Sequence, residues 1–123
     1  MKKFLLFSFL LISVAAFSQA PVEFKETKHS FGKLKQNVPA TYIFSFTNTG
    51  AKPAIIETAT AECGCTTPEY PKAPIAKGKT ATIKVTYNAA TPGQFTKKVN
   101  VKFANVPDVV VLTIDGEVVP ATK

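Results

Sequence analysis

Two cysteines separated by a single glycine are the residues in this chain most able to do chemistry. They form Cys63-Gly64-Cys65, which continues as Thr66-Thr67-Pro68, and the sequence has no other cysteine. In an extended segment, residues i and i+2 point to the same face and lie about 6.6 Å apart, near the upper limit for the Cα atoms of a disulfide. We expect Gly64 to relieve this distance, because a residue without a Cβ atom adopts bent or left-handed conformations easily.

Three uses of this pair are consistent with thiol chemistry. The first is a local disulfide, or a buried pair, that shapes the exit of a strand. The second is redox exchange with the thiols of a partner, in which Thr67-Pro68 would begin one helical turn whose amide dipoles stabilise a thiolate on Cys65. The third is copper(I) binding, which two thiolates on one face suit. A ring this small contributes little chain entropy, so a purely structural staple is the less natural design.

The other polar residues predict no catalytic or metal site. His29 is the only histidine, and nothing in the sequence places it near the cysteines, so a solvent-facing position at a strand start is its ordinary interpretation. One histidine cannot supply a Ser, His, Asp grouping beyond coincidence, and the acidic residues lack the spacing of a calcium loop. We therefore expect no catalytic residue, no metal site and no cofactor, and hence no enzyme.

The charge of the chain argues against a nucleic-acid partner. Its formal net charge is +7, all fifteen basic residues are lysines, and arginine is absent. Arginine makes the bidentate contacts to guanine and phosphate on which nucleic-acid recognition commonly depends. The lysines, which are mostly spread singly along the chain, indicate a role in solubility instead.

The residues after position 18 have the balance of a pleated sheet. They include many Val, Ile and Thr but only two Leu and no Met, and β-branched residues favour strands. Aromatic and aliphatic residues alternate with polar ones around Phe44 and again around Val85, which predicts strands with one buried face. Turn residues interrupt these runs at short intervals. The sequence therefore predicts an all-β, immunoglobulin-like two-sheet sandwich of about seven antiparallel strands. The expected strands are Val22–Glu26, Ser30–Leu34, Ala40–Asn48, Ala54–Ala61, Thr80–Tyr87, Phe95–Phe103 and Val109–Val118.

The N-terminus has the layout of a secretory signal peptide. Lys2 and Lys3 precede a short apolar run, and Ala16 and Ser18 are small residues at the −3 and −1 positions of a cleavage site. We expect cleavage after Ser18, or alternatively after Ala20. Residues 1–18 are then the signal peptide and residues 19–123 the sandwich domain, exported to the periplasm, the cell surface or the medium without a transmembrane segment. No cysteine lies near the cut to be acylated, which argues against a lipid anchor.

Several motifs occur in an order and spacing that resemble a known family, domain of unknown function 1573. The resemblance covers the whole chain after the signal peptide and implies an immunoglobulin-like sandwich in a secreted or envelope protein. This family is similar to hydin-type and major-sperm-protein-like domains, in which comparable modules serve protein interaction or scaffolding. The resemblance implies no reaction. The motifs are Phe31-Gly32, Phe44 to Gly50, Cys63 to Thr66, Pro74 to Gly78, Tyr87-Asn88 and Gly93 to Lys97.

The sequence thus favours an exported, non-enzymatic protein-interaction or scaffold module. The alternative is a thiol-redox-active or copper(I)-binding envelope protein that uses Cys63-Gly64-Cys65, with Gly64, Thr66, Thr67 and Pro68 as the loop supporting the pair. We expect a protein partner, whose identity the sequence does not specify.

Overall fold

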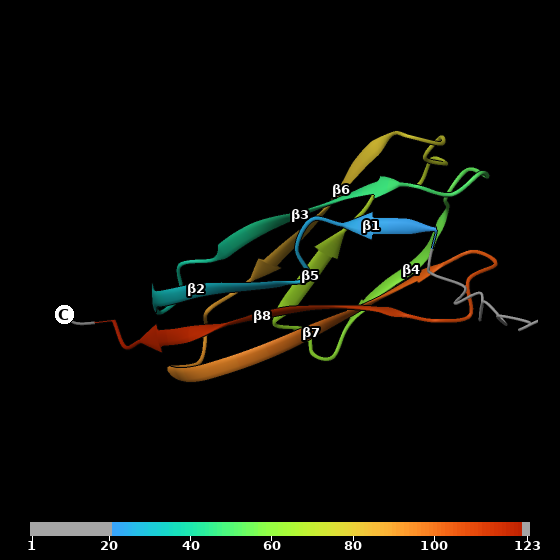
Figure 1. Cartoon of the computed structure of the whole chain (residues 1–123). Coiled ribbons are helices and arrows are strands. Elements are labelled where there is room, and N and C mark those ends of the chain that lie inside the picture. Colours follow the sequence, from blue (N-terminus) through green and yellow to red (C-terminus); the bar gives the residue numbers. More distant parts are fainter. Residues whose placement is uncertain (1–20, 122–123) are drawn as a thin grey trace, which may run out of the picture.

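Two four-stranded sheets pack face to face in the computed structural model, which describes residues 21–121 (Figure 1). The first sheet has the order β1-β3-β6-β5 and the second has the order β2-β8-β7-β4. This confirms the predicted all-β immunoglobulin-like sandwich. The predicted signal peptide, residues 1–18, lies outside the described residues. The strands are β1 (Val22–Phe24), β2 (Lys28–Lys35), β3 (Ala40–Asn48), β4 (Ile56–Ala61), β5 (Thr66–Glu69), β6 (Thr80–Tyr87), β7 (Gly93–Phe103) and β8 (Val110–Val119).

Two features differ from the expected strand pattern. There are eight strands, because Thr66–Glu69 forms the additional strand β5 at the edge of the first sheet. In addition, β2 pairs with β8 in parallel, whereas every other strand pair is antiparallel. The bounds of β3 and β6 are as predicted, since their period-two alternation is the most regular in the chain.

One apolar layer fills the space between the sheets. Phe44 and Phe46 of β3 and Phe103 of β7 are each about 1% exposed, and the rings of Phe46 and Phe103 meet edge to face across the core at 5.5 Å. Burying one such side chain contributes about 1.5–3 kcal/mol. The layer holds the sheets together and thereby fixes the loops that join them.

A bulge in β2 explains the Phe31-Gly32 motif. The register of β2 against β8 shifts between Ser30 and Lys33, and Gly32 has a φ of 70°, which is costly for a residue with a side chain. Opposite it, a Cβ atom at Gly116 would lie 2.8 Å from the carbonyl oxygen of Gly32. Glycine at both positions therefore allows the two backbones to approach at the one parallel pairing.

Asn48, the last residue of β3, organises the loops that leave this end of the sandwich. Its side chain is fully buried, and its Nδ2 donates to the carbonyl oxygens of Lys52 and Ile75, both at 2.8 Å. Its Oδ1 accepts from the backbone N–H of Gly50 at 3.0 Å. A Cβ atom at Gly50 would lie 2.6 Å from that of Pro21. The Asn-x-Gly motif thus joins the loop after β3, the loop before β6 and the start of β1.

We predict that Asn48→Asp destabilises the domain by about 2–4 kcal/mol, because it removes two donated hydrogen bonds and leaves a buried carboxylate facing two carbonyl oxygens. Urea denaturation of the purified domain measures the change. Asn100→Asp is the matched control, because Asn100 is exposed on β7 and its substitution should change the unfolding free energy little. Equal effects of the two substitutions would contradict the role given to Asn48.

Candidate functional site

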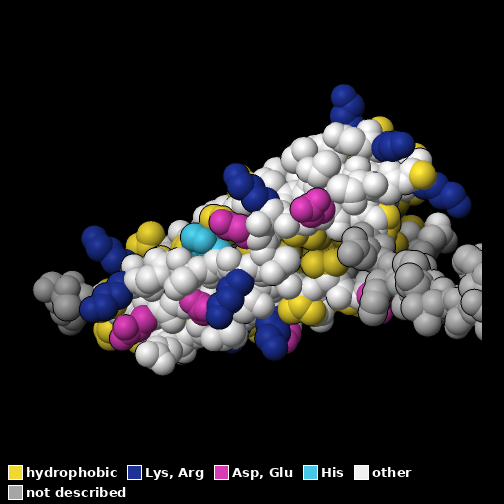
Figure 2. All heavy atoms as spheres, viewed as in Figure 1, with side chains coloured by type: hydrophobic (Ala, Val, Ile, Leu, Met, Phe, Trp, Pro, Cys, Tyr) yellow, Lys and Arg dark blue, Asp and Glu magenta, His cyan; other side chains and the backbone are white. Residues whose placement is uncertain are grey.

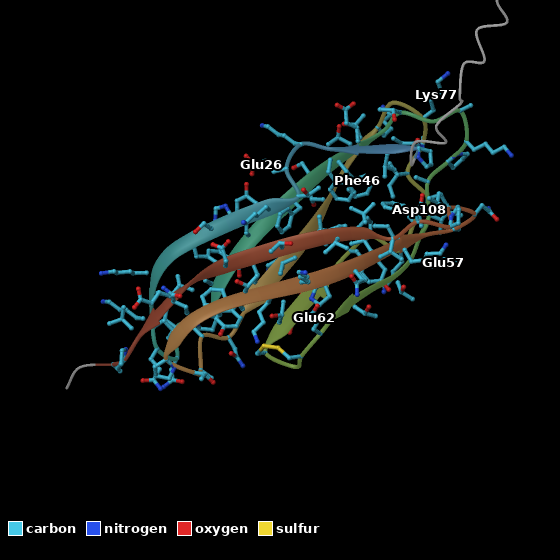
Figure 3. The ribbon with its side chains drawn as sticks, turned by 60° about the horizontal axis from the view of Figure 1, so that its bottom comes forward. Glu26, Phe46, Glu57, Glu62, Lys77 and Asp108 are labelled. Atoms are coloured by element: carbon cyan, nitrogen blue, oxygen red, sulfur yellow. A yellow bond between two sulfur atoms is a disulfide. The ribbon has the colours of Figure 1, made fainter. Side chains whose placement is uncertain are left out.

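The cysteines lie where the chain crosses from one sheet to the other. Strand β4, at the edge of the second sheet, ends at Ala61, and β5, at the edge of the first sheet, begins at Thr66. Cys63 and Cys65 form a disulfide within this crossing, with their Cα atoms 5.3 Å apart. Figure 3 shows its yellow bond beside the labelled Glu62. The backbone N–H of Asn88 donates to the Cys65 carbonyl at 2.9 Å, which fixes the crossing to the end of β6.

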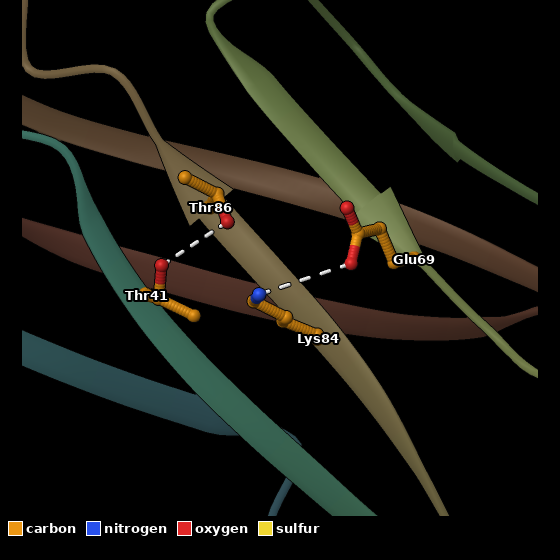
Figure 4. Close-up of polar contacts among 4 residues, drawn as sticks. All are labelled: Thr41, Glu69, Lys84 and Thr86. Carbon is orange, nitrogen blue, oxygen red and sulfur yellow. Dashed lines mark hydrogen bonds and ion pairs between the residues drawn. The ribbon is translucent and has the colours of Figure 1, made fainter.

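The structure contradicts the predicted helical turn at Thr67-Pro68. Both residues lie in β5, where Thr67 pairs with Thr86 and Pro68 with Val85 of β6. Proline is tolerated there because β5 is an edge strand. Figure 4 shows Glu69 of β5 facing Lys84 of β6 at 3.9 Å, beside a hydroxyl contact between Thr41 and Thr86. The exposed ion pair contributes little to stability, and there is no helix N-terminus here to stabilise a thiolate on Cys65.

Gly64 is exposed in a turn. The sequence predicts a bent or a left-handed conformation for Gly64, and the left-handed one is not present. A Cβ atom on Gly64 would meet nothing within 4 Å, so neither backbone strain nor crowding requires glycine at this position. Glycine at this position instead affects the surface, because the residue between the two cysteines has no side chain that could cover the disulfide.

Cys65 and Thr66 connect the disulfide to the core. Both cysteines are half-buried, and Cys65 packs against the apolar layer. The Thr66 side chain is only 4% exposed, and its hydroxyl oxygen lies 3.7 Å from the Cys65 sulfur. A disulfide sulfur carries no proton, so the threonine hydroxyl is the donor in this contact. Thr66 and Asn48 are the two buried polar residues of the described chain.

His29 lies far from the cysteines in the sheet order. It is on β2, at the opposite edge of the second sheet from β4, and its ring stacks on Tyr42 with a centroid distance of 3.5 Å and an interplanar angle of 4°. The Tyr42 hydroxyl donates a short hydrogen bond to Glu26. This bond, burial and the negative charge of Glu26 all raise the pKa of Tyr42 above its usual value. Among residues 21–121, no three His, Cys, Asp or Glu residues gather as metal ligands.

An apolar groove that the sequence analysis did not predict lies at the other end of β4 from the cysteines. Its volume is about 640 Å³, and its apolar lining comes from the loop before β4, the loop after β7 and Pro74 in the loop before β6. Ile55 is 40% exposed at its surface, while Phe103 is buried beneath it. Antiparallel backbone bonds between Ala54 and Ile75, of 2.8 and 2.7 Å, hold two of its loops together. The sequence signal for these loops is Pro53 and Pro74, whereas Ile55 falls in the predicted strand Ala54–Ala61 and lies instead just before β4.

One lysine lines the groove, and others lie on a neighbouring loop. Lys52 lines it directly, and Lys79 lies beside Asn48, whose N–H donates to the Lys79 carbonyl at 2.9 Å. Figure 2 shows lysine side chains projecting from this end of the molecule, and Figure 3 labels Lys77 and Asp108 there. Within the described part of the chain, no helix is long and apolar enough to cross a membrane.

Comparison with protein families gives one match over nearly all of the described chain. The model for the family described as "Protein of unknown function (DUF1573)" matches residues 22–118. No curated protein matches the chain.

Solved structures share the fold at low sequence identity. A protein of unknown function from Porphyromonas gingivalis W83 superposes with a TM-score of 0.68 and 14% identity over 78% of this chain, which spans only 46% of that protein. The ASH/PapD-like domain 7 of human CEP192 gives 0.71 and 10%, with 89% of this chain and 94% of that domain covered. The secreted serine protease VesC from Vibrio cholerae gives 0.65 and 14%, with 85% of this chain but 24% of the protease covered. These likenesses describe the sandwich architecture.

We predict that Glu26→Ala lowers the pKa of Tyr42 toward the ordinary tyrosine value, because it removes both the hydrogen bond to the neutral phenol and the nearby negative charge. The pH titration of the Tyr42 ring carbon signal by NMR measures this. Glu23→Ala removes an exposed carboxylate on neighbouring β1 and should leave the Tyr42 titration near that of the unsubstituted protein. A Tyr42 pKa that is the same in all three proteins would contradict the assignment.

Proposed function

Because the chain belongs to the DUF1573 family, whose description assigns no reaction, we propose a function from its own surface. The domain is an exported, non-enzymatic interaction module that binds an extended apolar segment of a partner protein in the groove beside Ile55. The observation that carries this proposal is the groove itself, an apolar recess with a hydrogen-bonded base, lined by Lys52 and next to the lysines of the loop before β6.

The groove suits apolar side chains better than a polar small molecule. Its volume lies within the range of about 300–1,000 Å³ found for ligand sites, but apart from Lys52 and Asn105 its lining side chains are apolar. Specific small-molecule sites normally add several convergent polar groups. Ile55 and the flanking prolines instead offer surface whose removal from water stabilises a complex.

Side-chain and backbone hydrogen bonds hold the loops at the base of the groove together. Asn48 holds the Lys52 and Ile75 carbonyls, and the Ala54–Ile75 bridge joins the same two loops. A site that does not need to order its loops on binding loses less conformational entropy. The groove can therefore bind a segment with modest contact area.

The charges around the groove specify the chemistry of the segment. Lys52 lines the groove, and Lys77 and Lys79 lie on the adjoining loop before β6. Figure 3 labels two acids at this end, Asp108 and Glu57, of which Glu57 is paired with Lys102 at 3.7 Å. Acidic residues on both sides of an apolar core segment would complement the lysines beside the groove, increase the association rate and fix the orientation of the segment. The partner segment that we propose is thus apolar at its centre and acidic at its flanks.

A second candidate function is thiol redox activity at Cys63 and Cys65. It is favoured by the contact between the Cys65 sulfur and the buried Thr66 hydroxyl, which a passive surface disulfide does not need. Copper(I) binding is not proposed, because Cys63 and Cys65 are joined in a disulfide and so offer no thiolate to a metal.

Export predicts a defined mature N-terminus. When the full chain is expressed in a bacterium, we expect intact-mass analysis of the envelope and secreted fractions to find a product that begins at Gln19. Ser18→Lys should block cleavage there and accumulate the precursor, since the −1 position requires a small residue. A wild-type product in the cytoplasm that retains residues 1–18 would contradict export.

Groove binding predicts a charge-selective peptide affinity. The test uses two fluorescent synthetic peptides with a central run of Leu and Val, one flanked by Glu and the other by Lys. Fluorescence anisotropy should show a higher affinity for the Glu-flanked peptide. Ile55→Asp should weaken the Glu-flanked complex by at least about tenfold, as expected for a central apolar contact.

Ile43→Asp is the matched control for this experiment. Ile43 is 53% exposed on β3 and does not line the groove, so its substitution should leave the affinity unchanged. Equal losses in both variants, or no saturable binding of either peptide, would overturn the proposal. A concentration-dependent dimer that only Ile55→Asp dissolves would instead identify a second copy of the chain as the occupant.

A further inference from the structure

The surroundings of the disulfide differ at its two sulfurs. We propose that the Cys63–Cys65 disulfide exchanges with a dithiol of another exported protein, with Cys63 as the sulfur that is attacked and Cys65 as the sulfur that leaves. This inference rests on the second candidate function, thiol redox activity, and adds to it the roles of the two sulfurs and the class of substrate.

Access favours attack on Cys63. Cys65 packs against the apolar layer, whereas Cys63 is not among the residues that do so. Cys63 lies between two exposed residues, Glu62 and Gly64, of which Gly64 has no side chain. Exchange requires the attacking, central and leaving sulfurs to lie in line. A thiolate that arrives from solvent can lie in line with the two sulfurs if it attacks Cys63. Cys65, on the core side, is then the leaving group.

Thr66 supports departure of the Cys65 sulfur. Its hydroxyl is buried and already lies 3.7 Å from that sulfur, so it donates a hydrogen bond to the thiolate as negative charge develops. A hydrogen bond to the charged form lowers the pKa of a thiol, and a leaving group of lower pKa departs faster. Thr66 acts through Cys65 and is therefore a positioning residue.

The sheets can hold the loop in place while the disulfide opens. Ala61 at the end of β4 pairs with Val99, and Thr66 at the start of β5 pairs with Tyr87. The Asn88 N–H also holds the Cys65 carbonyl. These bonds do not involve the sulfurs. The loop that the disulfide closes has only one residue between the cysteines, so its loss removes little chain-entropy stabilisation.

The exchange is a balanced transfer of one disulfide. A partner thiolate attacks Cys63, forming a partner–Cys63 bond while the Cys63–Cys65 bond breaks and its electron pair remains on Cys65. The second partner thiol, as a thiolate, then attacks the partner sulfur of this mixed disulfide and displaces the Cys63 thiolate. The partner is oxidised to a disulfide, and the domain is reduced to two thiols, which take up protons according to their pKa values.

The experiment uses the mature oxidised protein and reduced glutathione as the probe. The reaction is stopped by rapid alkylation, and intact mass with peptide mapping reports which cysteine carries glutathione and which is alkylated. We expect glutathione on Cys63 and the alkyl group on Cys65, in about tenfold excess over the reverse arrangement. Thr66→Val should slow opening of the disulfide several-fold. In the reverse assay, in which the reduced protein is the attacking thiol, Thr66→Val should move the pH dependence of the rate to higher pH, because the Cys65 thiol loses its hydrogen-bond donor. Thr66→Ser should restore both the opening rate and the pH dependence.

The possible failures separate the two claims. A disulfide that stays closed in a large excess of reduced glutathione overturns both redox activity and the assigned sulfur roles. Opening with glutathione on Cys65, or with Thr66→Val as fast as the unsubstituted protein, overturns the sulfur roles and leaves redox activity standing. Thermal unfolding verifies that each variant is folded. If Thr66→Val does not fold, mapping of the unsubstituted protein decides the attacked sulfur and Thr66→Ala tests the hydroxyl.

Discussion

The single apolar layer between the two sheets is the constraint on which the rest of the structure depends. Because both sheets bury one face against Phe46 and Phe103, the chain must repeatedly leave one sheet and enter the other. Backbone groups in these crossings have no strand partner and must find one elsewhere. The crossing after β3 is satisfied by the Asn48 side chain, and the crossing after β4 contains the disulfide.

The same constraint explains why the special features lie at the two ends of β4. At its start, the loops held by Asn48 leave Ile55 and the neighbouring prolines at the surface and form the groove. At its end, four residues span the distance between the sheets, so the cysteines are confined to a short turn against Thr66. The core holds both the groove and the cysteine crossing in place. Side chains that are not needed for packing determine what each site can bind or react with.

The sequence predicts the parts of this fold that depend on local pattern. Strands β3 and β6 were located to the residue, because alternation around Phe44 and Val85 is regular over their whole length. Strand β5 was missed, since its four residues include Pro68 and show no alternation, and its existence depends on pairing with β6. The parallel pairing of β2 with β8 joins residues 84 or 85 positions apart, and local sequence patterns carry no information on such distant pairing. The cysteines were identifiable from residue type, whereas the groove required loops from three parts of the chain.

The central claim is that a partner segment binds where the loop before β4 meets the loop after β7, and amide chemical-shift mapping by NMR tests it most directly. Titration of the mature domain with the Glu-flanked apolar peptide should shift the amide signals of Lys52, Ile55 and Ala104 and leave those of Gly64 and Thr66 in place. Shifts confined to the cysteine crossing, or spread over the outer faces of the sheets with the groove signals unchanged, would contradict the account.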